Sequence, residues 1–394
     1  MAAGLPRDLT FFKTNPEGQN VERTVRLVDV LGDGGEGTVF LGEMDGQNYA
    51  VKYVKLRLQT GKTRESVVKS NILNAMSEYV RVNEMQMCPN ILRSLMVIIP
   101  AKFYSASDKL KSLPFLNGHS INNESVYVIS NYLRGSSLNA FVEQSKERED
   151  YVYDVKRTFL QIVRAVKCMH DHGFVHRDLK PQNIMYENDD NITVIDFGSL
   201  CQIDKCAFKH DGFTPEYVPP EQANFESRSK NAPVPNNYAK NVESNRELYK
   251  KYDVFSLGCT LFNLLTTKIL FGGVLGALAW DKNVSRLSLP QIPNDHPQFG
   301  WIHLILDMIH PDPKTRFFLD DALLARIDAL PEPDFTLFTG IAAKQPAAAA
   351  AEQPAVAEQP AAAAANAEGG SRHRRRQTKA RRRYRRRISY RRRR

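Results

Sequence analysis

Apolar residues recur in this 394-residue chain with two different spacings. Longer segments, residues 64–87 and 151–172, repeat their apolar positions as one face of a helix does. Shorter apolar runs are typical of strands and cover residues 25–31, 39–41, 49–52, 125–129 and 192–195. The pattern predicts a mixed α+β domain.

The composition is that of a globular chain. Hydrophobic residues make up 42% of the sequence, which is ordinary for a domain with a buried core. The first eight residues lack the apolar centre of a secretion signal, and no apolar stretch reaches the roughly 18 residues of a membrane-spanning helix. We therefore expect neither secretion nor a membrane partner.

The five cysteines show no paired spacing; they are Cys88, Cys168, Cys201, Cys206 and Cys259. We expect ordinary reduced thiols, which are typical of the cytoplasm or the nucleus, and we predict that localisation. A metal site at Cys201, Cys206 and His210 is the alternative, but it lacks a fourth ligand and a usual zinc spacing.

The net charge of +10 divides unevenly along the chain. Residues 371–394 contain fourteen Arg, one Lys and no acid, so they carry +15 and the remainder carries −5. This tail resembles a protamine, with Arg clusters interrupted by Tyr384, Ile388 and Tyr390. Because cations at this density neutralise phosphates and tyrosines stack on bases, we expect a disordered tail that binds DNA or RNA. A nuclear-localisation signal is the milder interpretation.

A linker separates this tail from the rest of the chain. Residues 336–370 are rich in Ala, Pro, Glu and Gln, and Glu-Gln-Pro recurs at positions 352 and 358. With so few large apolar residues the segment cannot build a core of its own.

The strongest chemical signal is the stretch from His176 to Asn183, which reads HRDLKPQN. Its Asp178 can accept a proton from an attacking hydroxyl, and its Lys180 can neutralise charge on a phosphoryl group in transfer. Asn183 and the Asp196 of a following Asp-Phe-Gly are oxygen ligands for a metal ion. The two stretches resemble the catalytic and metal-binding loops of the eukaryotic-type protein kinases.

This resemblance covers about residues 25–330 and implies a two-lobed kinase fold. We expect an antiparallel β lobe with one helix at residues 25–130 and a larger, mainly helical lobe at residues 132–335. Residues 1–24 are polar, without a clear period, and form an N-terminal extension that either wraps the first lobe or stays loose.

Three glycines follow the first predicted strand; they are Gly32, Gly34 and Gly37. Glycine lets backbone amides approach phosphate oxygens closely. Dinucleotide-binding turns share this spacing, but a strand rather than a helix follows here, which favours the phosphate loop of a kinase. Glu36 departs from the family, which usually has an aromatic residue there, and its carboxylate mildly repels the phosphates of ATP.

The resemblance also assigns an ion pair beside the phosphates. Lys52, in Tyr-Ala-Val-Lys, matches the lysine that reaches the α- and β-phosphates. Its partner is a glutamate of the helix at residues 64–87. Counted back from Cys-Pro-Asn-Ile at positions 88–91, Glu78 fits with a one-residue insertion, and Glu84 is the alternative.

The nucleotide base is expected at the segment that joins the lobes. Ser130 falls at the gatekeeper position, and Asn131 stands where the family often has Glu, although recognition there uses backbone groups. The nucleotide-binding residues implied by the resemblance are Leu31, Gly32, Gly34, Gly37, Val39, Ala50, Lys52, Asn131 and Leu133.

The segment after Asp-Phe-Gly lacks the usual activating phosphosite. Between that motif and Phe213, the only hydroxyl side chain is that of Ser199. Arg177, which would pair with a phosphate, is present, and Asp204 and Asp211 are acids that can take the place of the phosphate.

Later motifs extend the resemblance. Residues 212–221 resemble the GTPxYxAPE of the family, and Glu221 is expected to pair in the interior with Arg316. Asp253 is expected to hold the backbone of the catalytic loop. Compared with the family that the chain resembles, the stretch from Glu221 to Asp253 is about twenty residues longer.

The leading hypothesis is a serine/threonine protein kinase that uses ATP and Mg²⁺, with Asn183 and Asp196 on the metal and proteins as substrates. Lys180 indicates the serine/threonine class. A pseudokinase scaffold and a nucleic-acid-condensing protein are the alternatives. Packaging of the kinase in a virus particle is an alternative location. The sequence leaves open the oligomeric state, the physiological substrate, and whether the chain phosphorylates its own Thr378 or Ser389.

Overall fold

The computed structural model of the protein describes residues 7–15, 17, 19–35, 37–57, 60–105, 118–120, 125–145, 154–206, 213–223, 246–273 and 289–339. The chain divides into two units, residues 1–345 and 346–394, and every described residue belongs to the first. Most of the predicted linker and the whole predicted tail therefore lie outside the described residues.

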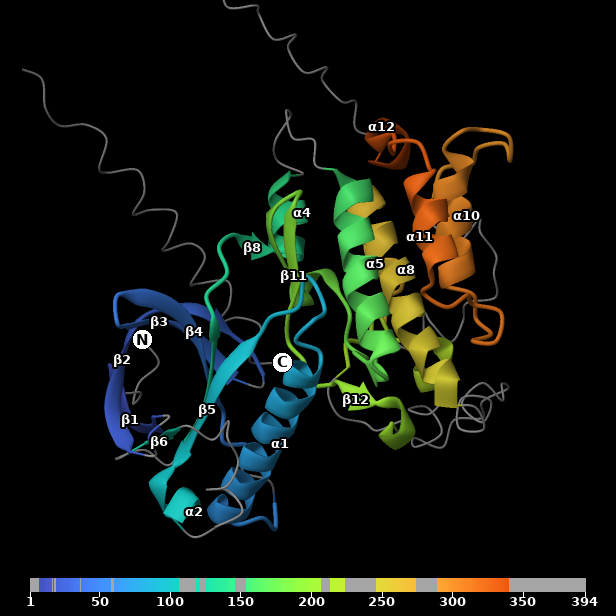
Figure 1. The fold of residues 1–394 in the computed structure, drawn as a ribbon. Helices are drawn as coiled ribbons and strands as arrows, with labels where there is room; N and C mark the ends of the chain where they lie inside the picture. Colours follow the sequence, from blue (N-terminus) through green and yellow to red (C-terminus); the bar gives the residue numbers. More distant parts are fainter. Residues whose placement is uncertain are drawn as a thin grey trace, which may run out of the picture. The chain divides into compact units, whose positions relative to one another are not determined.

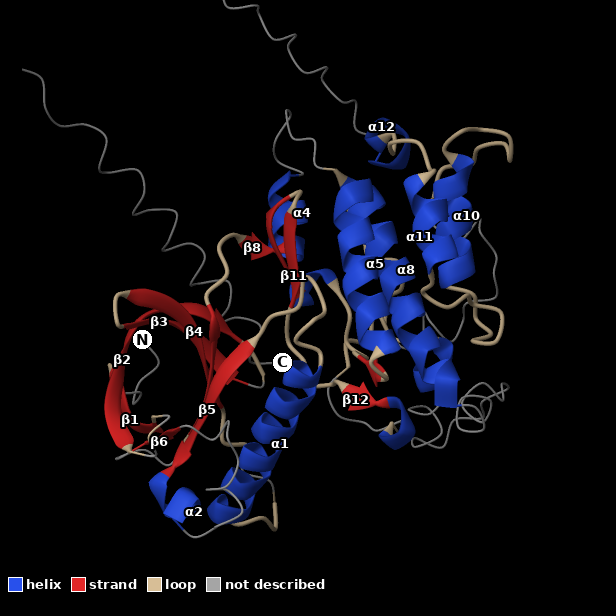
Figure 2. Cartoon of the chain, viewed as in Figure 1, coloured by secondary structure: helices blue, strands red, loops and turns tan. Residues whose placement is uncertain are grey.

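Strands from the first third of the chain close into a barrel, which forms the small lobe (Figure 1; Figure 2). Hydrogen-bonded neighbours are antiparallel except for β5 and β6, which are parallel. In order around the barrel the strands are β1 (Asp8–Thr14), β2 (Asn20–Asp33), β3 (Gly37–Met44), β4 (Gln47–Val54), β7 (Val126–Asn131), β5 (Ser94–Pro100) and β6 (Gly118–Ser120).

Alternation along the strands separates the barrel interior from an outer face. Val51 and Ile129 belong to the interior core, together with Phe11. Their neighbours Lys52 and Val128 lie opposite each other in register and take the outer face. The period of two along β4 therefore fixes the side of the sheet from which Lys52 projects.

The helix α1 (Arg64–Glu84) covers this outer face. Thr63 caps its N-terminus by accepting a hydrogen bond from the backbone N–H of Ser66 at 3.2 Å. Apolar residues on one side of the helix and on the outer face of the strands form a common core: Val68, Ile72, Ala75, Met76, Val97, Ile99, Val126 and Val128. The helix predicted at residues 64–87 is confirmed, and it lies over the face that carries Lys52.

Residues 1–24 were expected to wrap the first lobe or stay loose, but residues 8–14 and 20–24 are strands of the barrel. Leu9 and Phe11 of β1 are buried in its interior, and Asp8–Thr14 pairs with Asn20–Arg26. Between β5 and β7 along the chain lie a short helix, α2 (Ala101–Ser105), and β6, which joins β5 to β1. The hydrophobic pattern is weak in these strands because each contributes few inward residues.

The larger lobe is mainly helical (Figure 2). Its helices are α4 (Leu138–Ser145), α5 (Val155–Asp171), α8 (Lys250–Thr266), α10 (Phe299–Met308), α11 (Asp321–Asp328) and α12 (Phe335–Thr339). The large lobe also contains short strands and 3-10 turns: β8 (Ser136–Ser137), β9 (Phe174–Val175), η1 (Pro181–Asn183), β10 (Ile184–Asn188), β11 (Asn191–Val194), β12 (Cys201–Gln202), η2 (Ile203–Lys205) and η3 (Arg246–Tyr249).

The core of this lobe lies between α5 and α8. Phe159 and Val163 of α5 and Phe255 and Leu261 of α8 are fully buried in one cluster, which continues to Trp301 of α10. The helix predicted at residues 151–172 corresponds to α5, which begins at Val155 after its cap Asp154. A barrel lobe and a helical lobe confirm the predicted α+β class.

The cysteines differ from the expectation of reduced thiols. Cys88 is disulfide-bonded to Cys168, and Cys201 to Cys206, while Cys259 is free and buried. The fold brings Cys88 and Cys168 together across 80 residues, which no local spacing reveals. His210, the third member of the metal alternative, lies outside the described residues.

Within the described ranges, no helix is both long and apolar enough to cross a membrane.

Candidate active site

The loop from His176 to Asn183 is held by one buried carboxylate. Asp253 of α8 is fully buried, and it accepts hydrogen bonds from the backbone N–H groups of His176 and Arg177, both at 2.8 Å. His170 Nε2 contacts the same carboxylate at 2.9 Å. Three partners satisfy a charge that would be costly to bury alone, so Asp253 positions the loop backbone as expected.

The side chains of the loop gather around Asp178. Lys180 Nζ lies 2.6 Å from Asp178 Oδ2, and the Thr214 hydroxyl donates to Oδ1 at 2.8 Å. Asn183 Nδ2 donates to the backbone oxygen of Asp178 at 2.8 Å and to Oδ2 at 3.0 Å. Lys180 Nζ also donates to Thr214 Oγ1 at 2.5 Å. The predicted residues Asp178, Lys180 and Asn183 are thus brought into one cluster.

Lys52 and Asp196 form an ion pair between the lobes. Lys52 Nζ lies 3.3 Å from Asp196 Oδ1, although the two residues are 144 positions apart. Burial raises the pKa of the Asp196 carboxyl, but the charges of Lys52 and His176 and hydrogen bonds from Lys52 and the Gly198 backbone outweigh it, so the pKa is lowered. Asp196 is therefore a carboxylate at neutral pH.

The glycine loop joins β2 to β3 at the end of the barrel nearest Lys52. Gly34 N–H donates to the Gly37 carbonyl at 2.9 Å, which closes the turn. A Cβ on Gly37 would lie 2.3 Å from the Tyr53 carbonyl oxygen, so a side chain at this position meets backbone. Lys55, directly after β4, holds the turn because its Nζ donates to Gly34 O at 2.9 Å and to Asp33 Oδ1 at 2.6 Å.

A family model of the protein kinase domain matches residues 25–325. The chain belongs to the protein kinase family. The Drosophila melanogaster ovarian-specific serine/threonine-protein kinase Lok is 31% identical over 212 residues, covering 51% of this chain and 39% of the relative. The Saccharomyces cerevisiae serine/threonine-protein kinase KIC1 is 23% identical over 309 residues, covering 78% of this chain and 24% of the relative. The chain therefore spans well under half the length of these relatives.

The two candidates for the helix glutamate of this kinase differ in their position on α1. Glu78 follows the buried Ala75 by three residues and precedes the buried Val82 by four, so all three lie on the packed side of the helix. Glu78 itself is half-buried, whereas Glu84 is exposed at the last residue of the helix. The geometry favours Glu78.

The remaining nucleotide-binding candidates lie on the strands next to the lobe junction. Ala50 pairs with Ser130 and is half-buried, and Ser130 is buried. Asn131 is exposed at the end of β7, and Leu133 is half-buried just beyond it. In the glycine loop, Gly32 pairs with the half-buried Val39, and Leu31 is 46% exposed. Glu36 lies outside the described residues.

Two arginines fasten the start of the activation segment. Arg177 Nε donates to the Ser199 carbonyl at 2.8 Å, and Arg81 Nη1 from α1 donates to the Leu200 carbonyl at 2.5 Å. In this contact Arg177 binds a backbone carbonyl, and the replacement of the activating phosphate by an acid stays a prediction. Asp204 is exposed in η2, and Asp211 lies outside the described residues.

The late ion pair of the kinase is confirmed. Arg316 donates from Nη1 and Nη2 to the two carboxylate oxygens of Glu221 at 2.7 and 2.8 Å. Both side chains are buried, and Arg316 Nε also donates to the His310 carbonyl at 2.6 Å. Because the guanidinium binds both carboxylate oxygens and a backbone carbonyl, its N–H groups have acceptors in the interior. Such a buried pair fixes the geometry of the two segments that it joins.

Two residues of the site were missed from the sequence. Thr214 belongs to the motif at residues 212–221, but its hydroxyl received no role, and only the fold places it beside Asp178. Lys55 lies three residues beyond Lys52, just after β4 and outside any motif, so nothing local indicates that it reaches the glycine loop. Its contact with Asp33 and that of Thr38 lower the pKa of the Asp33 carboxyl.

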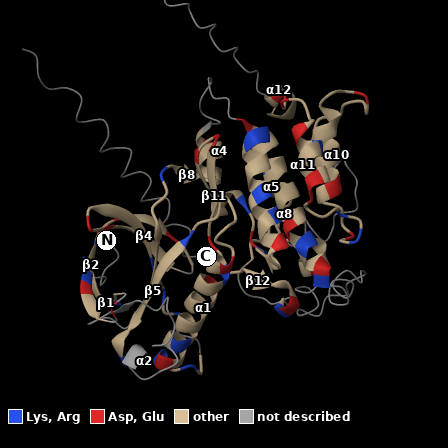
Figure 3. Ribbon diagram, in the orientation of Figure 1, with Lys and Arg blue, Asp and Glu red and all other residues tan. Residues whose placement is uncertain are grey.

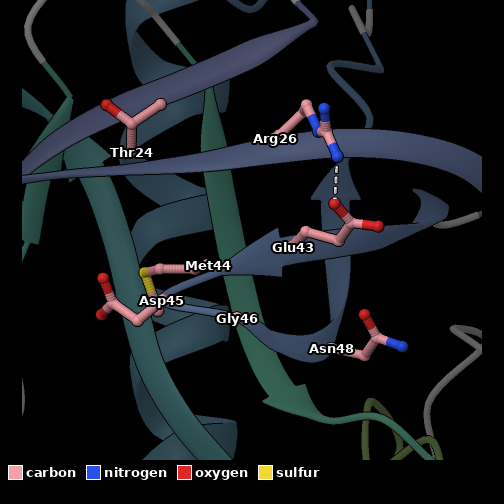
Figure 4. A pocket seen from close by; sticks show the side chains of 7 residues that line it. All are labelled: Thr24, Arg26, Glu43, Met44, Asp45, Gly46 and Asn48. Carbon is pink, nitrogen blue, oxygen red and sulfur yellow. Dashed lines mark hydrogen bonds and ion pairs between the residues drawn. The ribbon is translucent and has the colours of Figure 1, made fainter.

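A surface cavity of about 480 Å³ lies elsewhere on the small lobe (Figure 4). Its lining includes the β3–β4 turn, with Asp45 and Gly46, and the ion pair between Arg26 and Glu43. Because this turn is at the opposite end of the β3–β4 hairpin from Gly37, the cavity is separate from the site at Lys52.

Proposed function

We propose that this protein kinase transfers the γ-phosphate of ATP to serine and threonine hydroxyls of protein substrates. The observation that carries the proposal is the cluster of Asp178, Lys180, Asn183 and Thr214, with the Lys52–Asp196 pair beside it. The relatives named above are serine/threonine kinases, and the match extends over the residues of this cluster.

Asp178 is the proposed catalytic base for the acceptor hydroxyl. A carboxylate offers about four acceptor directions, and Thr214, Lys180 and Asn183 use three of them. The remaining direction is available to a substrate hydroxyl, whose proton Asp178 accepts as the phosphoryl group arrives. Lys180, already 2.6 Å from Asp178, supplies positive charge where the transferred group is most negative.

The metal ligands fit Mg²⁺. Asn183 uses its amide N–H groups on Asp178, so its carbonyl oxygen is the atom left for a metal, and Asp196 is ionised. Both are hard oxygen ligands, which Mg²⁺ prefers. When bound, Mg²⁺ neutralises charge on the β- and γ-phosphates of ATP.

The small lobe supplies the proposed nucleotide site. Lys52 projects from the outer face of β4 toward Asp196 and contacts the phosphates, and Glu78 of α1 positions it. Backbone amides of Gly32, Gly34 and Gly37 cover the phosphates. The base is held by the lobe junction with Ala50, Asn131 and Leu133 and by Leu31 and Val39 of the neighbouring strands.

Incubation of the purified full chain with labelled ATP, Mg²⁺ and a basic serine peptide tests this proposal. Label is expected on the serine peptide and not on a matched peptide with alanine at the acceptor. A pseudokinase scaffold is the alternative, and Glu36 is its main support in the sequence. Nucleotide binding without transfer to serine or threonine peptides would establish that alternative in place of the kinase.

We also propose that residues 371–394 bind DNA or RNA without sequence preference. Charges of both signs are interspersed over the described elements (Figure 3), whereas the tail carries +15 and no acid. If about ten phosphates are neutralised, log K against log[salt] has a slope of roughly −9. Deleting residues 371–394 removes this binding and preserves peptide phosphorylation; unchanged affinity in the deletion variant contradicts the proposal.

We propose the nucleus or the cytoplasm as the location of the protein, with a virus particle as the alternative.

A further inference from the structure

Cys88, Cys168 and His172 form a cluster outside the active site. Cys88 lies in the segment between α1 and β5, and Cys168 and His172 are one turn apart at the end of α5. The Cα atoms of the two cysteines are 5.6 Å apart, within the range of a disulfide. His172 Nδ1 lies 3.6 Å from Cys88 Sγ and 3.8 Å from Cys168 Sγ.

The imidazole edge that carries Nδ1 lies beside both sulfurs. His172 Nδ1 is 2.8 Å from the Cys168 carbonyl oxygen. Because a carbonyl oxygen only accepts, Nδ1 carries the hydrogen in this contact. A ring N–H beside a sulfur stabilises the thiolate, which is the form that attacks a disulfide.

Exposure distinguishes Cys168 from the other cysteines, including the buried Cys88. Cys168 is half-buried and His172 is exposed, so a small thiol reagent can reach one sulfur of the pair. Cys201 and Cys206 are both buried, and burial raises the pKa of the buried Cys259 thiol. Reactivity toward small disulfides is therefore expected first at Cys168.

We propose that Cys88 and Cys168 are a thiol–disulfide exchange site that takes a small disulfide such as glutathione disulfide as its oxidant. The Cys168 thiolate attacks one sulfur of glutathione disulfide, forms a mixed disulfide and releases one glutathione thiolate. The Cys88 thiolate then attacks the Cys168 sulfur, forms the Cys88–Cys168 bond and releases the second glutathione thiolate. The two thiol protons go to the two released thiolates, so two cysteines are oxidised and one glutathione disulfide is reduced.

The cross-link fastens the end of α1 to α5. Cys88 follows the C-terminal residues of α1, and its backbone N–H donates to the Met85 carbonyl at 2.9 Å. Asn90 and Leu92 already bind the backbone of β11, through contacts to the carbonyls of Ile192 and Val194 at 2.8 and 2.9 Å. Because these hydrogen bonds hold the segment in both redox states, the cross-link changes stability and leaves phosphate transfer unchanged.

The test equilibrates the full chain in glutathione buffers of increasing oxidation, blocks free thiols, and maps the peptides by mass spectrometry. A cross-link between the Cys88 and Cys168 peptides is expected, reversed by excess reduced glutathione. The oxidised protein is expected to unfold roughly 5 °C above the reduced one. Most of that increment is lost in Cys168→Ser, which leaves only the short Cys201–Cys206 cross-link, and most of it persists in the matched variant Cys201→Ser, which removes that short cross-link alone. Peptide phosphorylation stays within about twofold throughout.

His172→Gln separates the role of the imidazole from that of the sulfurs. Cross-linking is expected to slow about threefold or more, with the same extent at equilibrium. Free Cys88 and Cys168 thiols at every glutathione ratio would overturn the proposal. So would one zinc ion per reduced chain that is lost in both Cys88→Ser and Cys168→Ser, since the cluster is then a metal site.

Discussion

At Asp178, the neighbouring side chains decide how the carboxylate is oriented. Thr214 binds Oδ1, while Lys180 and Asn183 bind Oδ2, so the two oxygens are held by different elements of the large lobe. The loop motif could be recognised from the sequence because its residues are consecutive. The contribution of Thr214 could not, because it arrives from 36 positions away.

Replacing Thr214 tests this orientation at the scale of one hydroxyl. Thr214→Ala removes the donor to Asp178 and the acceptor for Lys180, and kcat for a serine peptide is expected to fall about tenfold, the effect of one charge-assisted hydrogen bond. Thr214→Ser keeps the hydroxyl and is expected to stay near the wild-type rate. Equal kcat values in the alanine variant and the wild type would show that Asp178 does not need this contact.

The Lys52–Asp196 pair predicts a pH dependence of stability. Lys52 helps to lower the folded-state pKa of Asp196 below its ordinary value, so the pair contributes stability above that ordinary value and loses it as pH falls through the lowered pKa. The melting temperature of Lys52→Met is therefore expected to lie below that of the wild type at neutral pH, with the difference shrinking below about pH 4. A difference that is constant down to pH 3 would contradict this assignment.

Among the elements, long periodic segments could be predicted and short strands could not. The helix predicted at residues 64–87 is α1, and the run at residues 192–195 is β11 within one residue. In β1 only Leu9 and Phe11 face the core, and the adjacent Phe12 obscures their alternation. The Cys88–Cys168 disulfide was missed because proximity across 80 residues leaves no local pattern.

The glycine loop allows a matched pair of substitutions. Gly37→Ala places a methyl group 2.3 Å from the Tyr53 carbonyl oxygen, so the free energy of unfolding is expected to fall by about 1–3 kcal/mol. A Cβ on Gly32 meets no atom within 4 Å, so Gly32→Ala is expected to unfold like the wild type. Chemical denaturation of both variants measures the difference, and equal midpoints would exclude the close approach at Gly37.

The activation segment is ordered by backbone contacts at its start, which predicts activity without phosphorylation there. Arg177 and Arg81 hold the carbonyls of Ser199 and Leu200, and β12 pairs with β9 directly before the catalytic loop. Protein treated with a phosphatase is expected to keep its peptide phosphorylation rate, and mass spectrometry to find residues 199–213 unmodified. A loss of activity on dephosphorylation that also occurs in a chain lacking residues 371–394 would contradict this prediction.

Across the whole molecule, two lobes contribute to one site. β4 of the barrel supplies Lys52, the large lobe supplies Asp178 and Asp196, and Asp253 of α8 holds the loop between them. The sequence assigned these residues because each belongs to a motif with fixed internal spacing. It could not supply the distances, because these depend on how barrel and helices pack.

The most direct measurement is the rate of phosphate transfer by Asp178→Asn, compared with wild type and with Asp328→Asn, which removes an exposed carboxylate of α11. With saturating ATP and Mg²⁺ and a serine peptide, Asp178→Asn is expected to transfer phosphate about a thousandfold more slowly, while its melting temperature stays close to wild type. Asp328→Asn is expected to match the wild-type rate. A wild-type rate in folded Asp178→Asn would contradict the assignment of Asp178 as the base and, with it, the proposed mechanism.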